Sequence, residues 1–303
     1  MEFDPQNLKK LYTPDKETHK GQNGKMLLIG GSHLFHGASL WALKVSSRIV
    51  DMVFYASTVE NKAIVAKLKE EFRDGILVPE GELESYLQEA DCVLIGPGMV
   101  RSAEPRISNF KFQISNLDDV NKIEDEGEQT YFLTKYLLNK YPDKRWVIDG
   151  GALQMMDLSW LYDVSNVILT PHSREFDGLV SRIADPKLRE ELLKVSKEEQ
   201  VSRFAKEYGC IVLLKGDIDI VSDGERIIEI PGGNAGMTKG GTGDVLAGLV
   251  AALCTKNDAL LSAISGSFIN KKAGESLFEK VGYYFNASDL VDEIPKVMKK
   301  FVI

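Results

Sequence analysis

Residues 231–254 read PGGNAGMTKGGTGDVLAGLVAALC, and this stretch gives the strongest indication of the fold and of the functional site. Glycine occupies six of the twelve positions from 232 to 243, so the backbone there can adopt positive φ and approach a ligand closely. After Asp244 the pattern changes, because apolar residues recur at the spacing of one helical face. These residues are Val245, Leu246, Leu249, Val250 and Leu253. The stretch therefore predicts a glycine-rich loop that runs directly into a helix.

Such a junction favours the binding of an anion. The first backbone N–H groups of a helix have no partner inside the helix, and the helix dipole adds positive character to them. Asp244 lies at this junction, where it can cap the helix or accept a proton from a bound group. An ordinary glycine turn with Asp244 as its cap is the alternative, but a plain turn needs only one or two glycines. The loop fits neither G-x-x-x-x-G-K-[ST] nor G-x-G-x-x-G, the two best-known phosphate loops.

Composition limits the classes of function. The chain has 303 residues, of which 44% are hydrophobic, with a net charge of −8 and a pI of about 5.2. This acidic balance argues against a partner that is a nucleic acid or a membrane surface. Cys92, Cys210 and Cys254 lie far apart in apolar runs, which is typical of reduced thiols in the cytoplasm, and no metal-ligand spacing occurs. The charged N-terminal residues lack the apolar core of a signal peptide, so we expect a cytoplasmic protein.

The other apolar segments predict a mostly parallel sheet with helices between its strands. Strands are expected at 25–29, 52–55, 91–95, 146–149, 167–170 and 210–214, and a hairpin at 218–221 and 226–230. Helices are expected at 37–48, 61–72, 82–89, 130–139, 186–193, 198–208, 260–279 and 287–300, besides the one that follows the glycine loop. We expect a single domain over residues 1–303, with a polar surface insertion at about 100–127.

Short turns follow the expected strands at once, and they define a cleft. The turns are Gly30-Gly31, Gly96-Pro97-Gly98, Asp149-Gly150-Gly151, Pro171-His172 and Lys215-Gly216. Because the carboxyl ends of parallel strands share one edge of a sheet, where ligands bind, these turns are predicted to line one site. Lys215 there suits nucleotide phosphates and His172 suits a ligand contact, although a solvated lysine and a plain loop histidine are the alternatives. Of three weaker candidates, Asn234 can bind phosphate or order the loop, Glu175 can cap a helix or bind a Mg²⁺-bound water, and Lys239 is expected to be solvated.

Six segments together resemble one family. They are KMLLIGGS at 25–32, DCVLIGPGM at 91–99, VIDGGAL at 147–153, TPHSREF at 170–176, VLLKGD at 212–217 and GGNAGMTKGGTGDVLAGL at 232–249. In this order they resemble the signatures of the ADP/ATP-dependent NAD(P)H-hydrate dehydratases, which belong to the ribokinase-like superfamily. The resemblance implies an α/β fold, a ribokinase-like three-layer α/β/α sandwich with a mostly parallel central sheet.

The resemblance also implies a reaction and a set of site residues. The S-form of NAD(P)H hydrate would be dehydrated with ADP or ATP as co-substrate and Mg²⁺ as cofactor, with Asp244 as base and residues 240–243 stabilising the phosphate. Substrate contacts would come from Ala38, Gly98, His172 and Asp244. Nucleotide contacts would come from Lys215, Gly216, Asp217, Ile218, Asp219, Asn234, Gly240, Gly241, Thr242 and Gly243. Members of the family are often homo-tetramers, so a homo-oligomer is expected.

The sequence departs from the family pattern at some of these positions. Arg174 replaces a frequent glycine, and Asp217 and Asp219 bring negative charge after Lys215-Gly216. Two alternatives therefore stay open: a ribokinase-like kinase that phosphorylates a small alcohol, such as a sugar, a hydroxymethylpyrimidine or a hydroxyethylthiazole, and a nucleotide-binding protein with weak catalysis. NAGM before GTGD, together with Pro171-His172 and Glu175, favours the dehydratase.

Overall fold

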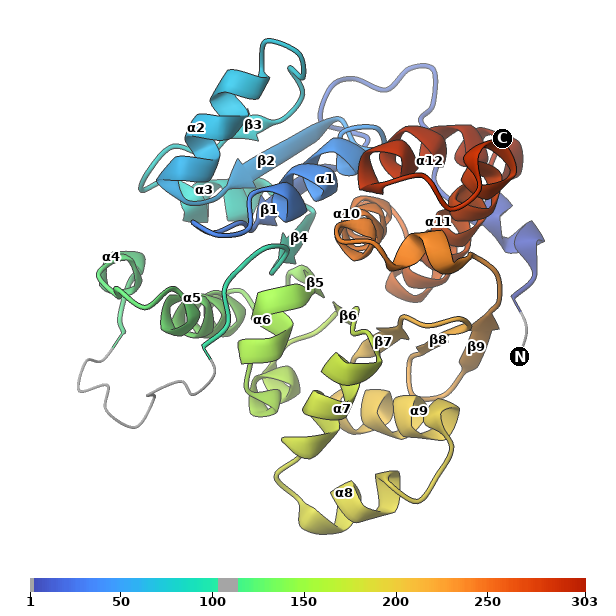
Figure 1. The fold of residues 1–303 in the computed structure, drawn as a ribbon. Helices are drawn as coiled ribbons and strands as arrows, with labels where there is room; N and C mark the ends of the chain where they lie inside the picture. The colour runs from blue at the N-terminus through green and yellow to red at the C-terminus, as the bar shows by residue number, and fades with distance from the viewer. Residues whose placement is uncertain (1–2, 103–113) are drawn as a thin grey trace.

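The fold is seen in a computed structural model that describes residues 3–102 and 114–303. The strands of these residues form one nine-stranded sheet with the order β3-β2-β1-β4-β5-β6-β7-β8-β9 (Figure 1). Neighbours from β3 to β7 pair in parallel, and β8 and β9 add an antiparallel hairpin at one edge. The strands are β1 (Lys25–Ile29), β2 (Met52–Ala56), β3 (Ile76–Leu77), β4 (Cys92–Ile95), β5 (Arg145–Ile148), β6 (Val167–Leu169), β7 (Ile211–Leu214), β8 (Asp219–Ser222) and β9 (Ile227–Ile230). The expected mostly parallel α/β sheet is confirmed.

Helices cover both faces of the sheet and make it the middle of three layers (Figure 1). Successive side chains of a strand point to opposite faces, so in β1 Met26 and Leu28 join one apolar cluster while Leu27 and Ile29 join the other. The first cluster includes α1 (Gly37–Ser46), α2 (Val59–Leu68), α10 (Thr242–Cys254), α11 (Ala259–Val281) and α12 (Ala287–Phe301). The second includes α3 (Leu83–Glu89), α4 (Leu117–Asn121), α5 (Glu126–Lys140), α6 (Gly150–Met155), α7 (Ser173–Ser181), α8 (Pro186–Leu192) and α9 (Lys197–Tyr208). Short 3-10 helices are found at η1 (Pro5–Lys10), η3 (Leu158–Asp163) and η4 (Ala235–Thr238).

The structure changes part of the picture expected for residues 100–127. Residues 103–113 lie outside the described residues. Helix α5 begins at Glu126 rather than at 130, because Asp125 caps it by accepting a hydrogen bond of 2.8 Å from Glu128 N. Val120 of α4 is only 1% exposed and belongs to the second apolar cluster, so this helix packs against the body of the protein. The polar composition of this segment gave no sign that Val120 would be buried.

Within residues 3–102 and 114–303, none of the helices combines the length and the apolar character that crossing a bilayer requires. The longest is α11, at 23 residues, and its charged positions include Lys271, Lys272 and Glu275. Cys92, Cys210 and Cys254 are buried and free, as their apolar surroundings predicted.

Candidate active site

Asp244 stands in the first turn of α10, where the glycine loop ends. Gly241 precedes this helix with a φ of 97°, and a Cβ atom there would lie 2.4 Å from the Trp41 ring, so only glycine fits. Burial, which is the largest influence, and the negative charge of Asp149 raise the pKa of Asp244, Lys215 opposes them, and the resulting pKa is about 7. A carboxyl group with a pKa near 7 is suited to accept a proton at neutral pH.

Lys215 and Asp149 form an ion pair beside Asp244. The Nζ atom of Lys215 donates to Asp149 Oδ1 at 3.0 Å, and the two side chains are 18% and 4% exposed. A Cβ atom added at Gly243 would lie 3.5 Å from Lys215 Nζ, so the ammonium group lies against the first turn of α10. Burial is the largest influence on Lys215 and lowers its pKa, but the carboxylates of Asp149 and Glu175 outweigh it and the pKa rises. Lys215 is therefore a fixed positive charge at the mouth of the anion loop.

His172 occupies the start of α7 next to this ion pair. Its backbone pairs with that of Lys215 in an isolated parallel bridge, which continues the alignment of β6 and β7. Its Nδ1 accepts from Glu175 N at 3.2 Å, and His172 N donates to Glu175 Oε2 at 2.9 Å, which makes a capping box. The expectation that Glu175 caps this helix is confirmed. The imidazole of His172 is 53% exposed and open to a ligand.

Ala38 and Gly98 approach each other across the ends of β1 and β4. A Cβ atom at Gly98 would lie 3.0 Å from Ala38 Cβ and 2.9 Å from Phe35 O, and φ at Gly98 is +71°. At Gly96 the close approach is stricter, because a Cβ atom would lie 1.7 Å from Asp149 O. Side chains are thus excluded where these turns meet, and the backbone itself is left to contact a ligand.

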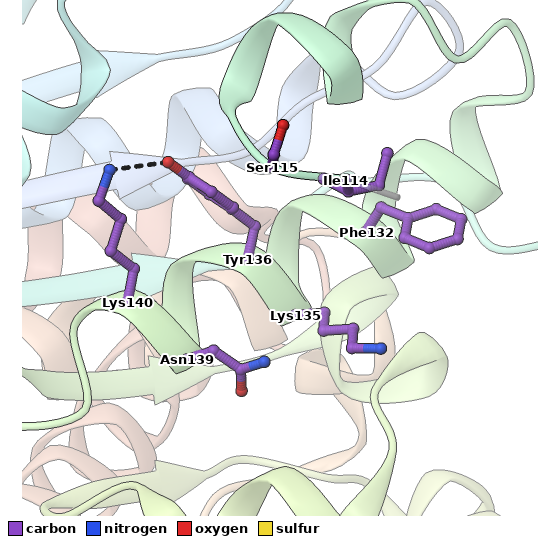
Figure 2. Close-up of a pocket in the computed structure, with 7 residues that line it drawn as sticks. All are labelled: Ile114, Ser115, Phe132, Lys135, Tyr136, Asn139 and Lys140. Atoms are coloured by element: carbon purple, nitrogen blue, oxygen red, sulfur yellow. Dashed lines mark hydrogen bonds between the residues drawn. The ribbon is translucent and has the colours of Figure 1, made fainter. Parts of the chain in front are cut away.

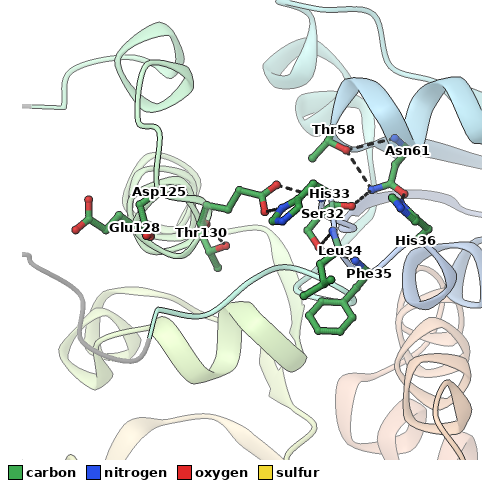
Figure 3. A network of polar contacts seen from close by, with 11 residues as sticks. Ser32, His33, Leu34, Phe35, His36, Thr58, Asn61, Asp125, Glu128 and Thr130 are labelled. Atoms are coloured by element: carbon green, nitrogen blue, oxygen red, sulfur yellow. Dashed lines mark hydrogen bonds and ion pairs between the residues drawn. The ribbon is translucent and has the colours of Figure 1, made fainter.

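The loop before Ala38 is braced at two points (Figure 3). His33 contacts Glu126 at the start of α5 through its ring and through its backbone N–H, the latter at 3.1 Å. The buried side chain of Asn61 donates to Ser32 O at 2.8 Å and contacts His36 Nδ1 at 2.9 Å. The β1–α1 loop is therefore held in one shape, with Ala38 at its end.

The glycine loop is held from behind by its own polar side chains. Asn234 accepts from Gly236 N at 2.9 Å and donates to Gly274 O at 2.8 Å, so it orders the loop. Thr242 Oγ1 bonds to Met237 O at 2.6 Å and to Lys239 O at 2.9 Å. Lys239 is exposed, as expected for a solvated lysine, but its Nζ also donates to the carbonyl groups of Tyr283 and Phe285. The nucleotide contacts predicted for Asn234 and Thr242 would use their backbone, because their side chains already have partners.

Asp219 and Lys271 support the turn between β7 and β8. Asp219 is 4% exposed and accepts from Gly216 N at 2.9 Å and from Ser267 Oγ at 2.6 Å. Lys271 of α11 approaches it at 3.3 Å. Its Nζ also donates to Gly216 O and Asp217 O, both at 2.9 Å. The side chain of Asp219 therefore shapes the Lys215–Gly216 turn from behind, and Lys271 balances its negative charge.

Sequence analysis placed Asp149 in a turn that lines the site but gave it no role, and it did not name Lys271. Asp149 directly follows a buried strand, so its place at the carboxyl end of β5 was a usable signal. Thr170 Oγ1 donates to its Oδ1 at 2.8 Å, which helps to fix the carboxylate. Lys271 had no such signal, because it lies in the middle of a long helix and reaches Asp219 only after folding. Among the residues that the structure describes, no group of three or more His, Cys, Asp or Glu side chains is arranged to hold a metal ion.

Comparisons with solved structures agree with the fold. A ribokinase-like superfamily protein from Enterococcus faecalis V583 superposes with a TM-score of 0.77 at 21% identity, covering 99% of this chain and 95% of that one. The ADP/ATP-dependent NAD(P)H-hydrate dehydratase of Bacillus subtilis, crystallised with ATP/Mg²⁺, superposes with a TM-score of 0.71 at 21% identity, covering 99% and 98%. The expected ribokinase-like sandwich is confirmed.

Comparisons with sequences identify the family. A family model described as NAD(P)H-hydrate dehydratase matches residues 26–296. The chain is 34% identical to the bifunctional NAD(P)H-hydrate repair enzyme of Methanocaldococcus jannaschii over 97% of its own length, but spans only 52% of that protein. It is 33% identical to the ADP-dependent (S)-NAD(P)H-hydrate dehydratase of Nitrosopumilus maritimus, over 97% of this chain and 96% of that one. The chain therefore belongs to the NAD(P)H-hydrate dehydratase family.

Proposed function

We propose that this protein dehydrates the S-form of NAD(P)H hydrate to NAD(P)H, with ADP or ATP as phosphoryl donor. The observation that carries the proposal is the position of Asp244, a carboxyl group with a raised pKa, beside Lys215 at an anion-binding helix start. Ala38, Gly98 and His172 lie along the same edge of the sheet, after β1, β4 and β6. The named activities of the relatives favour dehydration over the phosphorylation of a small alcohol, which the same fold also supports.

The chemistry proceeds in two steps. In the first step Asp244 accepts the proton of the ring hydroxyl, and the hydroxyl oxygen bonds to the terminal phosphorus of the nucleotide. The P–O bond of the anhydride breaks at the same time. The C–O bond then breaks and phosphate leaves, the proton of the adjacent ring carbon passes to the departing phosphate, and the electrons of that C–H bond form the ring double bond again. Asp244 releases the hydroxyl proton to solvent. Phosphate is a far better leaving group than hydroxide, which is why the nucleotide is consumed.

Charge stabilisation comes from the chain itself. The first turn of α10 directs backbone N–H groups at the transferring phosphoryl group, and Lys215 supplies a positive charge beside them. Asp149 holds the ammonium group in place from below. Asp217 and Ile218 are exposed on the adjoining turn, within reach of the rest of the nucleotide.

Mg²⁺ is part of the proposal as a companion of the nucleotide. It is usually held by one or two carboxylates, several waters and the substrate phosphates, so a closed cage of protein ligands is not required. Asp149 and Glu175 are the carboxylates that would receive its bound waters, since both line this edge beside Lys215. When bound, the ion neutralises charge on the phosphates.

The experiment follows the return of reduced-nicotinamide absorbance after NADH hydrate is mixed with protein, Mg²⁺ and either ADP or ATP. We expect recovery that depends on the nucleotide and that falls by about 10²–10⁴-fold in Asp244→Asn, the usual contribution of a general base. Asp289→Asn, which changes a carboxyl group in the capping box of α12, is the matched control and should keep activity. Folded protein that binds nucleotide but restores no absorbance with either donor would overturn the proposal.

A further inference from the structure

A cavity of about 640 Å³ continues the carboxyl edge of the sheet beyond the candidate active site. It is lined at the ends of β1, β2 and β3 by Gly31, Thr58 and Pro79, and on its far side by α4 and α5. A smaller hollow of about 490 Å³ adjoins it and shares Ser115, Tyr136 and Lys140 (Figure 2). The size suits one half of a dinucleotide, since small-molecule sites are typically about 300–1,000 Å³.

The cavity begins where the candidate active site ends. Gly31 lines it, and a Cβ atom at Gly98 would lie 3.3 Å from Gly31 Cα. Met99, the residue after Gly98, lines it as well. A ligand whose reacting ring rests on Gly98 therefore reaches the cavity without leaving the edge of the sheet.

Strand order decides which way such a ligand extends. Asp149, His172 and Lys215 follow β5, β6 and β7, on one side of the Gly98 turn. The phosphoryl donor needs that side, because the anion loop and Lys215 are there. The remainder of the substrate must then run the other way, toward the ends of β1, β2 and β3, where the cavity lies.

The charge of the lining is negative. Four carboxylates face two ammonium groups in it, namely Glu60, Glu80, Glu84 and Asp118 against Lys62 and Lys140. Lys140 and Glu84 already pair with each other, because Lys140 Nζ donates to Glu84 Oε1 at 2.7 Å. Lys140 Nζ also donates to Tyr136 OH at 2.8 Å (Figure 2). Glu60, Glu80 and Asp118 then remain against Lys62 alone. Hydroxyl and amide groups of Ser57, Asn116, Asn121 and Gln129 add neutral hydrogen-bonding capacity. Such a surface suits a ribose with free hydroxyls and disfavours an added phosphate.

We propose that this cavity binds the adenosine half of the dinucleotide substrate and that its carboxylates select the form without a 2′-phosphate. The inference rests on the proposed function for the identity of the substrate. The protein then uses NADH hydrate in preference to NADPH hydrate. Repulsion between unit charges about 4 Å apart in water makes the expected preference about fivefold, which corresponds to about 1 kcal/mol.

The first test blocks the cavity. Val59 lines it, is 69% exposed and begins α2, so Val59→Trp places an indole at the cavity without touching the core. We expect the KM for NADH hydrate to rise about tenfold, while hydrated nicotinamide mononucleotide, which lacks the adenosine half, keeps its kcat/KM. Val281→Trp is the matched control, because Val281 is 48% exposed at the end of α11 and outside this lining. Equal effects on the two substrates, or none on either, would overturn the inference.

The second test reverses the charge. Glu60→Lys/Glu80→Lys should move the ratio of kcat/KM for NADPH hydrate over NADH hydrate upward by about tenfold or more. Glu225→Lys/Glu279→Lys changes the net charge equally on exposed residues outside the lining and should leave the ratio unchanged. Binding of NADH and NADPH, followed by nicotinamide fluorescence, gives a readout that needs no turnover. Unchanged ratios and affinities would overturn the inference while dehydration of NADH hydrate still stood; loss of all dehydration in the unaltered protein would instead overturn the proposed function.

Discussion

Two lysine–aspartate ion pairs lie near the carboxyl edge of the sheet, and their roles differ. Lys215–Asp149 is 3.0 Å long, with side chains 18% and 4% exposed. Lys271–Asp219 is 3.3 Å long, with both side chains 6% exposed. The ammonium group of Lys215 faces the mouth of the anion loop. The ammonium group of Lys271 instead donates to three carbonyl groups, those of Gly216, Asp217 and Gly232.

The difference shows what makes a buried ion pair available for function. An ammonium group has three donors, and one that has filled them with backbone carbonyls has nothing left for a ligand. Lys271 therefore ties the turn after β7 to the glycine loop, and Lys215 is presented on that turn. We call Lys271–Asp219 the supporting layer and Lys215–Asp149 the working layer. The predictions below test the two roles one at a time.

The largest effect is expected from removing the supporting lysine. Lys271→Met leaves the carboxylate of Asp219 buried without its positive partner, which costs about 3–5 kcal/mol in the free energy of unfolding. Urea unfolding measures the loss. Lys272→Met, on the same helix and in a half-exposed ion pair, is the control and should cost less than about 1 kcal/mol. Equal stabilities of the two variants would mean that the buried pair does not support the turn.

Removing the working lysine should affect activity more than stability. Lys215→Met takes away a positive charge from the transferring phosphoryl group, so kcat/KM should fall by about 10²–10³-fold. The readout is the recovery of reduced-nicotinamide absorbance with ADP or ATP. A fall in stability as large as that of Lys271→Met, with activity retained in the folded fraction, would contradict the assignment of the two layers.

The pH dependence of stability tests the environment of Asp244. Its pKa is raised from 3.8 to about 7, so the folded protein holds this proton more tightly than the unfolded chain does. Ionisation of Asp244 therefore destabilises the fold, and stability is lost as pH rises from about 4 to about 7. Asp244→Asn should be more stable than the unaltered protein by about 4 kcal/mol at pH 8, with no difference below pH 4. Chemical unfolding of both proteins across this pH range measures the difference in their free energies of unfolding. A difference that stays constant with pH would contradict the raised pKa.

The pH dependence of catalysis has the opposite sign. Only ionised Asp244 accepts a proton, so kcat/KM should rise with pH through about 7 and level off above it. Steady-state rates at saturating nucleotide measure the profile. A profile that is flat between pH 5.5 and 8.5, in a protein that stays folded, would exclude Asp244 as the base.

The smallest effect is expected at Asn234, which orders the glycine loop. Asn234→Ala removes the bonds to Gly236 N and Gly274 O, so it should cost about 1 kcal/mol of stability, the usual value for a lost cap. The KM for the nucleotide should change by less than about twofold, since both ends of this amide already have protein partners. A large rise in this KM would show a direct contact with the nucleotide instead.

Local patterns were sufficient for most elements and for part of the site. The glycine loop, helix α10, Asp244, the β8–β9 hairpin and the strand-end turns could be read from short stretches, because each depends on neighbouring residues. The capping role of Glu175 was likewise a local matter, three residues from His172. Helix α6 was not foreseen, because its six residues follow the Gly150 turn without a long enough apolar period.

The sequence by itself determined that a glycine loop would meet a helix at Asp244 and that buried strands would end in turns on one edge. Those features are local, since apolar spacing and glycine content act within a few residues. Only the tertiary structure decided that Asp149 meets Lys215, that Lys271 meets Asp219, and that a cavity opens beside Gly98. These partners lie 66 and 52 residues apart, and their meeting depends on the order of strands in the sheet and on how α11 packs against it. Pairing over such separations is set by the burial of whole helices and strands, which no short pattern in the chain encodes.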